Sequence, residues 1–300
     1  MANGSVDTLA QALAQFETIG MPARNLAVRT RREYSRDLRD MLSYLEQVGI
    51  TQLDAVRPRV LEGYLAELDR RGLQGSTRNR KVHTLKTFFK WLVSQEFLMT
   101  NPAGQLMTPR AIKKEPRYLS EEEYRRLLRA CSHHARDAAV IEVFLQTGMR
   151  LSELAGLTLT DIELPKRITR DIESMGSVRV RRKGGKIERI PLNYKACQAL
   201  AAYLKVRPKV DHDGLFVTKF KSRMTARSIE YMVSKYLIET GIRHASVHTL
   251  RHTMATHHVA RGTDLKTVQV TLGHASLETT SIYVSLSKRA QKKALQEHAL

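Results

Sequence analysis

Four short segments of this sequence carry residues whose types and spacing suit chemistry on a phosphate ester. The first, TGMRLSEL (147–154), places Arg150 three residues before Glu153. If Gly148 ends one helix, Arg150 begins the next, where free N–H groups and the helix dipole already favour an anion. An arginine at this position indicates an anionic ligand nearby, with Glu153 holding the guanidinium. The alternative is an ordinary surface ion pair.

The second segment is the centre of SVRVRRKGGKIERIPL (177–192), in which apolar and polar residues alternate around Gly184 and Gly185. Alternation around two glycines predicts a β-hairpin. Lys183 and Lys186 flank the turn, where a lysine can contact a phosphate or, if its pKa is lowered, donate a proton. A solvated turn lysine is the alternative.

The third segment, HTLRHTMATHH (248–258), places His248 and Arg251 three residues apart, on one face of a predicted helix. His248 and His252 also have the spacing of two metal ligands. No glutamate follows the first histidine, however, and no third carboxylate ligand is evident. We therefore predict no metal site.

The fourth segment, LGHASLETTSIY (272–283), places His274 directly after Gly273 and Tyr283 nine residues later. Glycine is the residue that most often ends a helix, so Gly273 is expected to expose the histidine that follows it. Tyr283 is one of ten tyrosines. Taken alone, such a residue is more often structural than nucleophilic.

Together these residue types can attack a phosphodiester without a metal ion. Arginine stays charged and its planar fork matches two phosphate oxygens, so two arginines can hold the extra charge of a pentacoordinate transition state. A tyrosine hydroxyl, with a pKa of about 10, needs a proton acceptor, and His248 suits that role. The leaving 5′-oxygen needs a proton, which Lys183 could donate.

The elements that must position these residues are mostly helices. Apolar residues recur with a 3.6-residue period, Pro58 suits a first helical position, and Gly49 and Gly72 are plausible stops. Ser120 and Glu123 form a capping box at a further helix start. Helices are expected around residues 38–48, 58–71, 78–100, 193–206, 225–240 and 249–261, the third ending at Asn101-Pro102.

Cations of nearly one sign lie opposite the apolar stripe of the third helix, which favours contact with a DNA backbone over a merely solvated face. The whole chain has 50 Lys and Arg against 30 Asp and Glu, a net charge of +20 that also favours a polyanionic partner. The alternative is a soluble basic protein without such a partner. The cations on the third helix are Arg78, Arg80, Lys81, Lys86 and Lys90.

The stretch from Pro102 to Pro116 has three prolines and no clear period, so we expect a linker at 111–116. It divides a helical domain, 1–110, from a larger mostly α domain, 117–300, with a small antiparallel β-sheet. Two distant cysteines fit a reducing cytoplasm and argue against disulfides. Neither a signal peptide nor a membrane span is predicted.

The order Arg, Lys, His-x-x-Arg, His, Tyr resembles the tyrosine recombinase (phage integrase) family, most of all its compact Xer-type members. TGMRLSEL is similar to the family's first arginine box. HTLRH, GTDLKTVQVTLGH and the step from His274 to Tyr283 are similar to its second box. The resemblance covers nearly the whole chain. It implies a mainly α fold, with an N-terminal helical core-binding (SAM-like) domain and a catalytic domain.

The resemblance also implies roles for individual residues. Tyr283 would be the nucleophile, forming a 3′-phosphotyrosyl intermediate and freeing a 5′-hydroxyl. Arg150 and Arg251 would clamp the scissile phosphate, with Glu153 supporting Arg150. Because the bond energy is kept in the phosphotyrosyl link, neither ATP nor any other cofactor or metal is expected.

The remaining roles implied by the resemblance concern protons and DNA contacts. Lys183 would be the general acid, His248 the acid–base residue and His274 a further phosphate ligand. The turn KGGKIER departs slightly from the family pattern, which leaves a choice between Lys183 and Lys186. We prefer Lys183 as the acid and take Lys186 as a DNA contact.

In the family, four protomers hold two sites in double-stranded DNA and exchange strands through a Holliday junction. We therefore expect a homo-tetramer, or a hetero-tetramer with a paralogue, acting in the cytoplasm on the nucleoid. A type IB topoisomerase-like enzyme and a DNA-binding regulator with a decayed site are the alternatives. The sequence does not choose between integration, excision, transposon resolution and chromosome dimer resolution, and the stretch 161–178, longer than usual in the family, has no predicted role.

Overall fold

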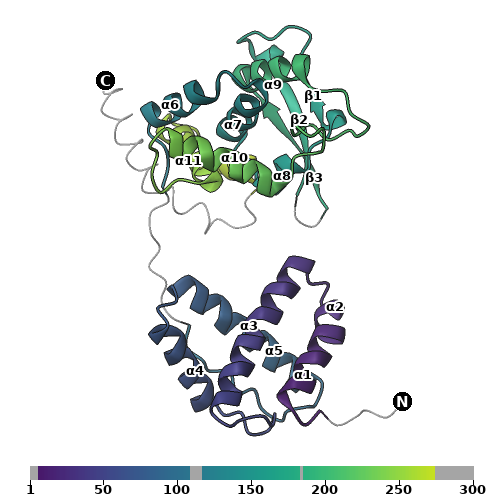
Figure 1. The fold of residues 1–300 in the computed structure, drawn as a ribbon, viewed down its shortest axis with the longest axis vertical. Coiled ribbons are helices and arrows are strands. Elements are labelled where there is room, and N and C mark those ends of the chain that lie inside the picture. Colours follow the sequence, from purple (N-terminus) through teal and green to yellow (C-terminus); the bar gives the residue numbers. More distant parts are fainter. Residues whose placement is uncertain (1–5, 109–116, 183–184, 274–300) are drawn as a thin grey trace. The chain divides into compact units, whose positions relative to one another are not determined.

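The computed structural model describes residues 6–108, 117–182 and 185–273. The chain forms two compact units, Met1–Lys114 and Glu115–Leu300, shown in Figure 1. Helices dominate both units, and the second adds a small antiparallel sheet. The mainly α fold expected from the sequence is confirmed, whereas the expected linker at 111–116 lies outside the described residues.

The first unit is a bundle of helices around an aromatic core. Phe16 and Phe88 meet edge to face with ring centroids 5.3 Å apart, and Phe88 meets Phe89 at 5.1 Å. Such contacts add to the burial of the rings themselves. The elements are α1 (Leu9–Gln15), a π-helical turn (Phe16–Gly20), α2 (Met21–Ala23), α3 (Val28–Gln47), α4 (Pro58–Arg70) and α5 (Gly75–Ser94).

Helix α5 ends earlier than expected. Glu96 takes a left-handed conformation with φ of 61°, and the N–H of Phe97 donates back to Leu92 O at 3.0 Å. This arrangement closes the helix at Ser94, before the chain reaches Asn101-Pro102. The expectation that Asn101-Pro102 ends this helix was therefore wrong, because a non-glycine residue supplies the left-handed cap.

Charged side chains are buried between α3 and α5. Asp37 is fully buried and accepts a hydrogen bond from Thr84, while Arg80 and Lys81 pair with its carboxylate. Lys81 is buried as well, with Nζ 2.7 Å from Asp40 Oδ2. Buried charges are tolerated only when they are paired, so this cluster fixes how α3 and α5 pack.

We expect Asp37→Ala to lower the free energy of unfolding of the first unit by about 3–5 kcal/mol, because Lys81 is left as a poorly compensated buried charge. Trp91 is the single tryptophan of the chain and is buried in this unit, so its fluorescence during urea unfolding reports the change. The matched control is Asp69→Ala, which removes an exposed partner of Arg78 and should cost about 0–1 kcal/mol. Equal losses for the two variants would contradict this account.

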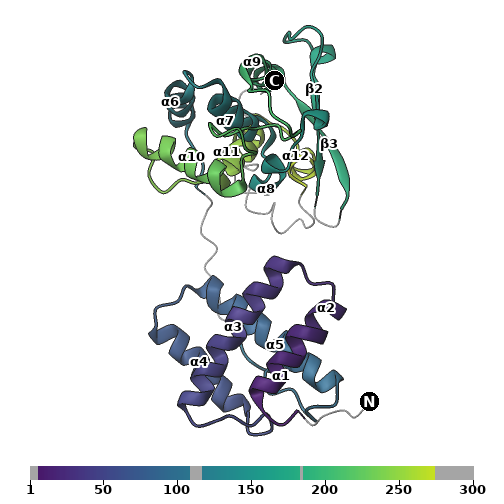
Figure 2. The same ribbon diagram turned by 45° about the vertical axis from the view of Figure 1, so that its right-hand side comes forward.

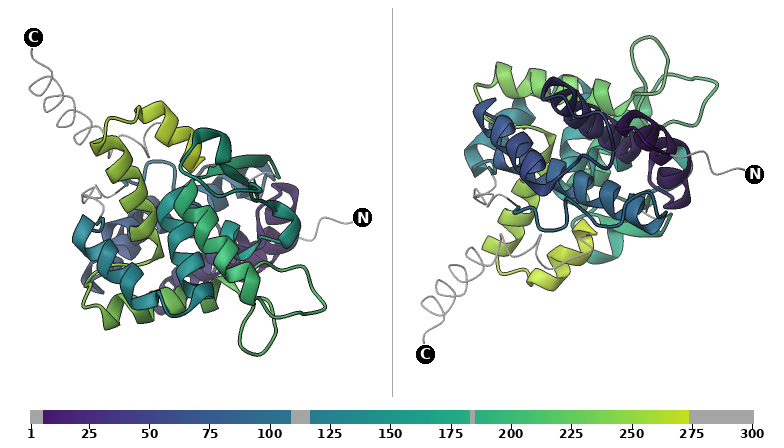
Figure 3. Two further views of the ribbon diagram at one scale, coloured as in Figure 1. Left: turned by 90° about the horizontal axis from the view of Figure 1, so that it is seen from above. Right: turned by 90° about the horizontal axis from the view of Figure 1, so that it is seen from below.

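The second unit gathers its helices around α7, as the labels in Figure 1 show, and Figure 3 gives two further views of the same ribbon. Helix α7 is buried along almost its whole length. Helix α7 packs against α9, α11, α6 and α10. The expected capping box of Ser120 and Glu123 starts α6. The helices are α6 (Glu121–Cys131), α7 (Ala135–Thr147), α8 (Leu151–Ala155), α9 (Tyr194–Val206), α10 (Ala226–Glu239), α11 (Val247–Ala260) and α12 (Leu265–Leu272).

The sheet of the second unit consists of three antiparallel strands in the order β1-β2-β3. The predicted hairpin is confirmed: β2 (Gly176–Arg181) pairs with β3 (Ile187–Leu192), with Val178 opposite Ile190. These two side chains are buried on the inner face. The stretch 161–178 supplies β1 (Ile162–Glu163), which pairs with β2, and a 3₁₀ turn (Ile172–Ser174). This stretch therefore adds an edge strand to the sheet.

The sheet and helices α8 and α12 lie side by side in the second unit (Figure 2). Arg182, which directly follows β2, and the end of α12 are therefore neighbours, although 89 residues of chain separate Arg182 from Thr271. In the parts of the chain that the structure describes, no helix is long and apolar enough to cross a membrane.

Candidate active site

The connection between α7 and α8 presents the first arginine. Gly148 ends α7 in a left-handed conformation with φ of 60°, as expected. A Cβ on this residue would have to displace the ends of Met254 and Leu272, 2.5 Å and 2.7 Å away, and the left-handed φ itself favours glycine. The chain then turns into α8 with Arg150 at the N-cap.

Glu153 holds Arg150 through both main chain and side chain. Its carboxylate accepts from Arg150 N at 2.8 Å and from Arg150 Nη1 at 2.7 Å. Glu153 is buried, whereas the Arg150 side chain remains 37% exposed. The predicted support of Arg150 by Glu153 is thus present, with part of the guanidinium open to a ligand.

Arg251 is the second arginine, and it is buried on α11. Its Nη1 donates to Gly148 O at 2.5 Å and its Nη2 to Leu272 O at 2.8 Å. These bonds join α11 to the end of α7 and the end of α12. Arg251 therefore fixes the relative position of the turn that carries Arg150.

Three guanidinium groups converge on the C-terminal end of α12. Arg150 Nη2 donates to Gly273 O at 2.9 Å, and Arg251 donates to Leu272 O. Arg182, at the end of β2, donates to Leu272 O at 3.2 Å and to Thr271 O at 2.9 Å. The last carbonyls of a helix carry partial negative charge, so they hold these cations close to one another. His274 follows this point directly in the sequence.

Arg150 opens into a basic hollow of about 1090 Å³ between α8 and the hairpin. Five arginines line it against two carboxylates, Glu153 and Asp161. A concave surface with this excess of positive charge attracts a phosphate backbone. The arginines are Arg150, Arg179, Arg181, Arg182 and Arg223.

The electrostatics of the site keep Glu153 ionised. Burial alone would raise its pKa, but hydrogen bonds from Arg150 and the charges of Arg182 and Arg150 outweigh burial and hold the pKa below its usual value. The stabilisation from this carboxylate is therefore present above the unfolded-state pKa of about 4.3 and is lost as the pH falls through the lower folded-state value.

We expect Glu153→Gln to destabilise the protein by about 2–3 kcal/mol at neutral pH, because charge-assisted hydrogen bonds to two arginines are weakened. The difference from wild type should shrink as the pH falls below about 4.3, where the carboxylate begins to be protonated in the unfolded state, and should vanish as the pH falls through the lower folded-state pKa. Urea unfolding at a series of pH values, followed by circular dichroism, measures it. A difference that stays constant down to acid pH would contradict the assigned role of the charge.

Of the other predicted site residues, two lie in the described part of the chain and three lie outside it. His248 is exposed in the first turn of α11, one turn before Arg251. Lys186 is exposed on the hairpin, with Nζ 3.0 Å from Glu188 Oε1. Outside the described residues lie three predicted site residues, Lys183, His274 and Tyr283.

No metal cluster is found in the described segments of the chain, where no group of three or more His, Cys, Asp and Glu side chains is placed to hold an ion. His252, the second histidine of the pair weighed in the sequence, is half-buried on α11. Burial lowers its pKa, and the charges of Arg251 and His248 lower it further.

The cations expected along α5 are not all available to a partner. Lys81 is buried among Asp37 and Asp40, so its assignment to an exposed DNA-binding face was wrong. Arg80 pairs with Asp37 and Arg78 with Asp69. Lys90 is exposed and Lys86 half-exposed, and both remain candidates for DNA contact.

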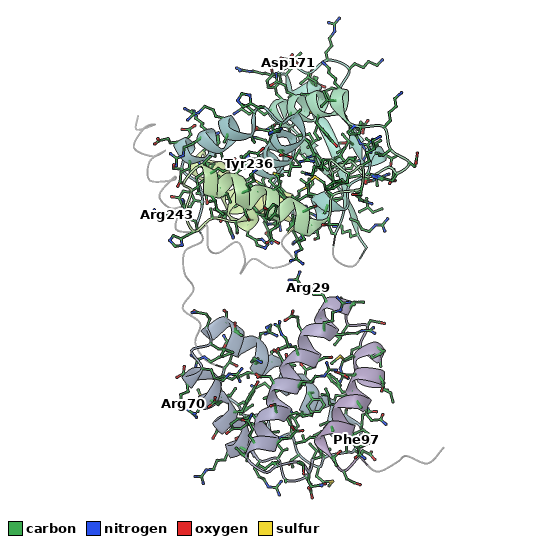
Figure 4. The ribbon with its side chains drawn as sticks, viewed as in Figure 1. Arg29, Arg70, Phe97, Asp171, Tyr236 and Arg243 are labelled. Atoms are coloured by element: carbon green, nitrogen blue, oxygen red, sulfur yellow. The ribbon has the colours of Figure 1, made fainter. Side chains whose placement is uncertain are left out.

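Sequence reasoning missed a row of arginines on α3. Spacings of three and four residues place them on one helical face, a signal that the sequence already contained. Arg29, at the start of the row, extends into solvent (Figure 4). Arg36 pairs with Glu33 and Arg39 with Glu17, so the row is only partly neutralised. The exposed members are Arg29, Arg32, Arg36 and Arg39.

Sequence reasoning also missed Arg182. Arg182 directly follows β2 and continues the alternation of Val178 and Val180, which both face inward. Because side chains alternate along a strand, an arginine at this position is directed toward the core. This two-residue alternation could have identified Arg182 as a residue of the site.

Comparison with known proteins agrees with this geometry. Residues 117–290 match the phage integrase family, and residues 13–96 match the phage integrase N-terminal SAM-like domain. The chain belongs to the phage integrase family. The family and fold class expected from the sequence are confirmed, and with them the expectation of a site-specific recombinase, an enzyme that breaks and rejoins DNA.

Individual relatives cover most of the chain. The tyrosine recombinase XerC of Natranaerobius thermophilus is 35% identical over 280 residues, 88% of this chain and 90% of that protein. The fold is similar to XerH bound to a palindromic difH substrate after cleavage, with a TM-score of 0.75 and 23% identity over 94% of this chain and 83% of that one. It is also similar to a lambda integrase tetramer bound to a Holliday junction, with a TM-score of 0.71 and 17% identity over 90% of this chain and 78% of that one.

Proposed function

We propose that the second unit cleaves DNA by attack of the Tyr283 hydroxyl on a phosphodiester held by Arg150 and Arg251. The observation that carries the proposal is the convergence of guanidinium groups at the end of α12, directly before His274 in the sequence. Two fixed arginines there offset the charge that develops on the phosphate during attack.

In the proposed reaction, a bond forms between the Tyr283 oxygen and phosphorus while the bond from phosphorus to the 5′-oxygen breaks. His248 accepts the tyrosine proton and Lys183 donates a proton to the departing 5′-oxygen. His274 is a further ligand of the phosphate. The product is a 3′-phosphotyrosyl link, and attack on it by a 5′-hydroxyl reverses the chemistry with no need for ATP, a metal or another cofactor.

We assign DNA binding to both units. In this proposal, residues 1–110 form the core-binding domain, 111–116 the linker and 117–300 the catalytic domain. The arginine row of α3 and residues Lys86 and Lys90 contact the sugar–phosphate backbone, as does Lys186 on the hairpin.

The active assembly in this proposal is four protomers on paired sites in double-stranded DNA, with strands exchanged through a Holliday junction. The lambda integrase tetramer bound to a Holliday junction, which has a similar fold, supports this arrangement. The four protomers are copies of this chain, or of this chain and a paralogue. The protein then acts in the cytoplasm, on the nucleoid.

Covalent capture in cells tests the proposal. Wild-type protein is expressed in its native host, the cells are opened in denaturing detergent, and DNA that stays attached to the purified protein is sequenced. We expect attached DNA to end at one recurrent sequence. Attachment at dispersed sequences would indicate a topoisomerase-like enzyme, and reversible binding without any attachment would indicate a regulator.

A further inference from the structure

The end of β2 buries an arginine to which the proposed chemistry gives no role. Arg182 follows directly after Arg181, the last residue of β2, and only 5% of its side chain is exposed. A buried guanidinium is costly unless its N–H groups find acceptors. The guanidinium of Arg182 therefore needs hydrogen-bond acceptors from neighbouring elements.

Arg182 finds these partners on three separate elements. Its Nη1 lies 3.1 and 3.0 Å from the two carboxylate oxygens of Glu153 on α8, and its Nε lies 3.1 Å from Glu188 Oε2 on β3. Nη1 and Nη2 also donate to Leu272 O and Thr271 O at the end of α12. One side chain thus joins the hairpin, the helix that begins after Arg150 and the helix that precedes His274.

A close backbone approach makes this arrangement specific. Gly273 has φ of 61°, and a Cβ on it would lie 2.6 Å from Arg182 Cζ. The guanidinium therefore packs directly against the glycine backbone, in space that any other residue would fill. The same glycine accepts the hydrogen bond from Arg150 Nη2.

We propose that Arg182 is a positioning residue for DNA cleavage, which holds Glu153 and the end of α12 so that Arg150 keeps the orientation needed to bind the phosphate. This inference rests on the proposed function. We assign Arg182 no direct contact with the phosphate, because only 5% of its side chain is exposed and its Nε, Nη1 and Nη2 atoms all donate to protein acceptors. It acts through Glu153, whose carboxylate it shares with Arg150.

The test measures cleavage by the full-length protein on a nicked duplex that carries the sequence recovered by covalent capture. The nick lets a short fragment diffuse away, so each cleavage leaves a covalent protein–DNA complex that a denaturing gel resolves. Two variants are compared with wild type. Arg182→Lys keeps a charge near Glu153 but has one donor group for acceptors on three elements, whereas Arg182→Met removes both charge and hydrogen bonds.

We expect both variants to cleave about 100-fold more slowly at saturating protein, because a displacement of about 1 Å at a reacting group has this effect, with DNA affinity unchanged. The acid limb of the pH profile should move to higher pH in Arg182→Met alone, since Glu153 loses a cation that lowers its pKa. The control is Arg189→Lys, the same change on the exposed face of the hairpin, where the arginine pairs with Glu163. It should cleave at the wild-type rate.

Gly273→Ala provides a second route that keeps Arg182 but displaces its guanidinium, and it should lower the cleavage rate in the same way. If wild type forms no covalent complex, the proposed function fails and this inference fails with it. If wild type cleaves and the Arg182 variants match it, only the inference is overturned. It is also overturned if the variants lose folding or DNA binding together with cleavage, or if the acid limb stays in place in Arg182→Met.

Discussion

Tyr283→Phe is expected to bind its DNA site as tightly as wild type and to form no covalent complex with it. The substitution removes one oxygen atom, the proposed nucleophile, and keeps the aromatic ring. DNA affinity should persist because it comes mainly from many cationic contacts with the backbone. A gel-shift assay measures binding, and detergent-resistant attachment to a nicked site measures cleavage.

The matched control for this variant is Tyr231→Phe, which removes a hydroxyl from a side chain that is 74% exposed on α10. It should form the covalent complex at the wild-type rate. If Tyr283→Phe still becomes attached to DNA, another residue is the nucleophile and the assignment of Tyr283 is wrong. If it loses DNA binding as well, its effect is not on chemistry alone.

Arg150→Lys should lower the rate of cleavage by about 100- to 1000-fold, the effect typical of losing one donor to a developing oxyanion. The two arms of the guanidinium reach Glu153 and Gly273 O in a fixed plane. A lysine keeps the charge but has a single head group, so it cannot bind these acceptors and a phosphate in the same geometry. The rate of covalent attachment to a nicked site at saturating protein measures the effect.

Arg125→Lys is the control for that substitution. Arg125 is exposed on α6 and pairs with Glu121 one turn away, an interaction that contributes little. It should therefore cleave as wild type does. Cleavage by Arg150→Lys at the same rate as this control would show that Arg150 does not hold the reacting phosphate.

The features predictable from the sequence were those that depend on neighbouring residues. Gly148 and Gly273 both end helices in the left-handed conformation, as glycine after an apolar periodic segment predicts. The hairpin followed from alternation around two glycines. The pairing of Arg150 with Glu153 followed from their separation of one helical turn. Each of these features depends on residues close together in the chain.

Features that depend on distant residues were not predictable in this way. Lys81 was expected on an exposed face that contacts DNA, but its partner Asp40 lies 41 residues away on α3, and only the folded unit brings them together. The convergence on α12 likewise joins Arg182 to Leu272, which is 90 residues away. Glu96 ends α5 because it adopts a left-handed backbone conformation, which a glutamate does not predict.

The candidate active site is held together by two sets of contacts. Arg150 is held by Glu153 and by the end of α12, and its partly exposed guanidinium faces the basic hollow. Glu153 and α12 are in turn joined by Arg182 and Arg251. This construction explains why four buried or half-buried charges are retained where apolar packing would cost less.

Mass spectrometry of the DNA-linked peptide identifies the residue that attacks the DNA. Protein with attached DNA is digested with protease and nuclease, and the modified peptide and the polarity of its link are determined. We expect one nucleotide remnant, joined through its 3′-phosphate to the tyrosine oxygen of Tyr283, with a free 5′-hydroxyl on the other DNA end. A remnant on any other residue, or a link through a 5′-phosphate, would contradict it.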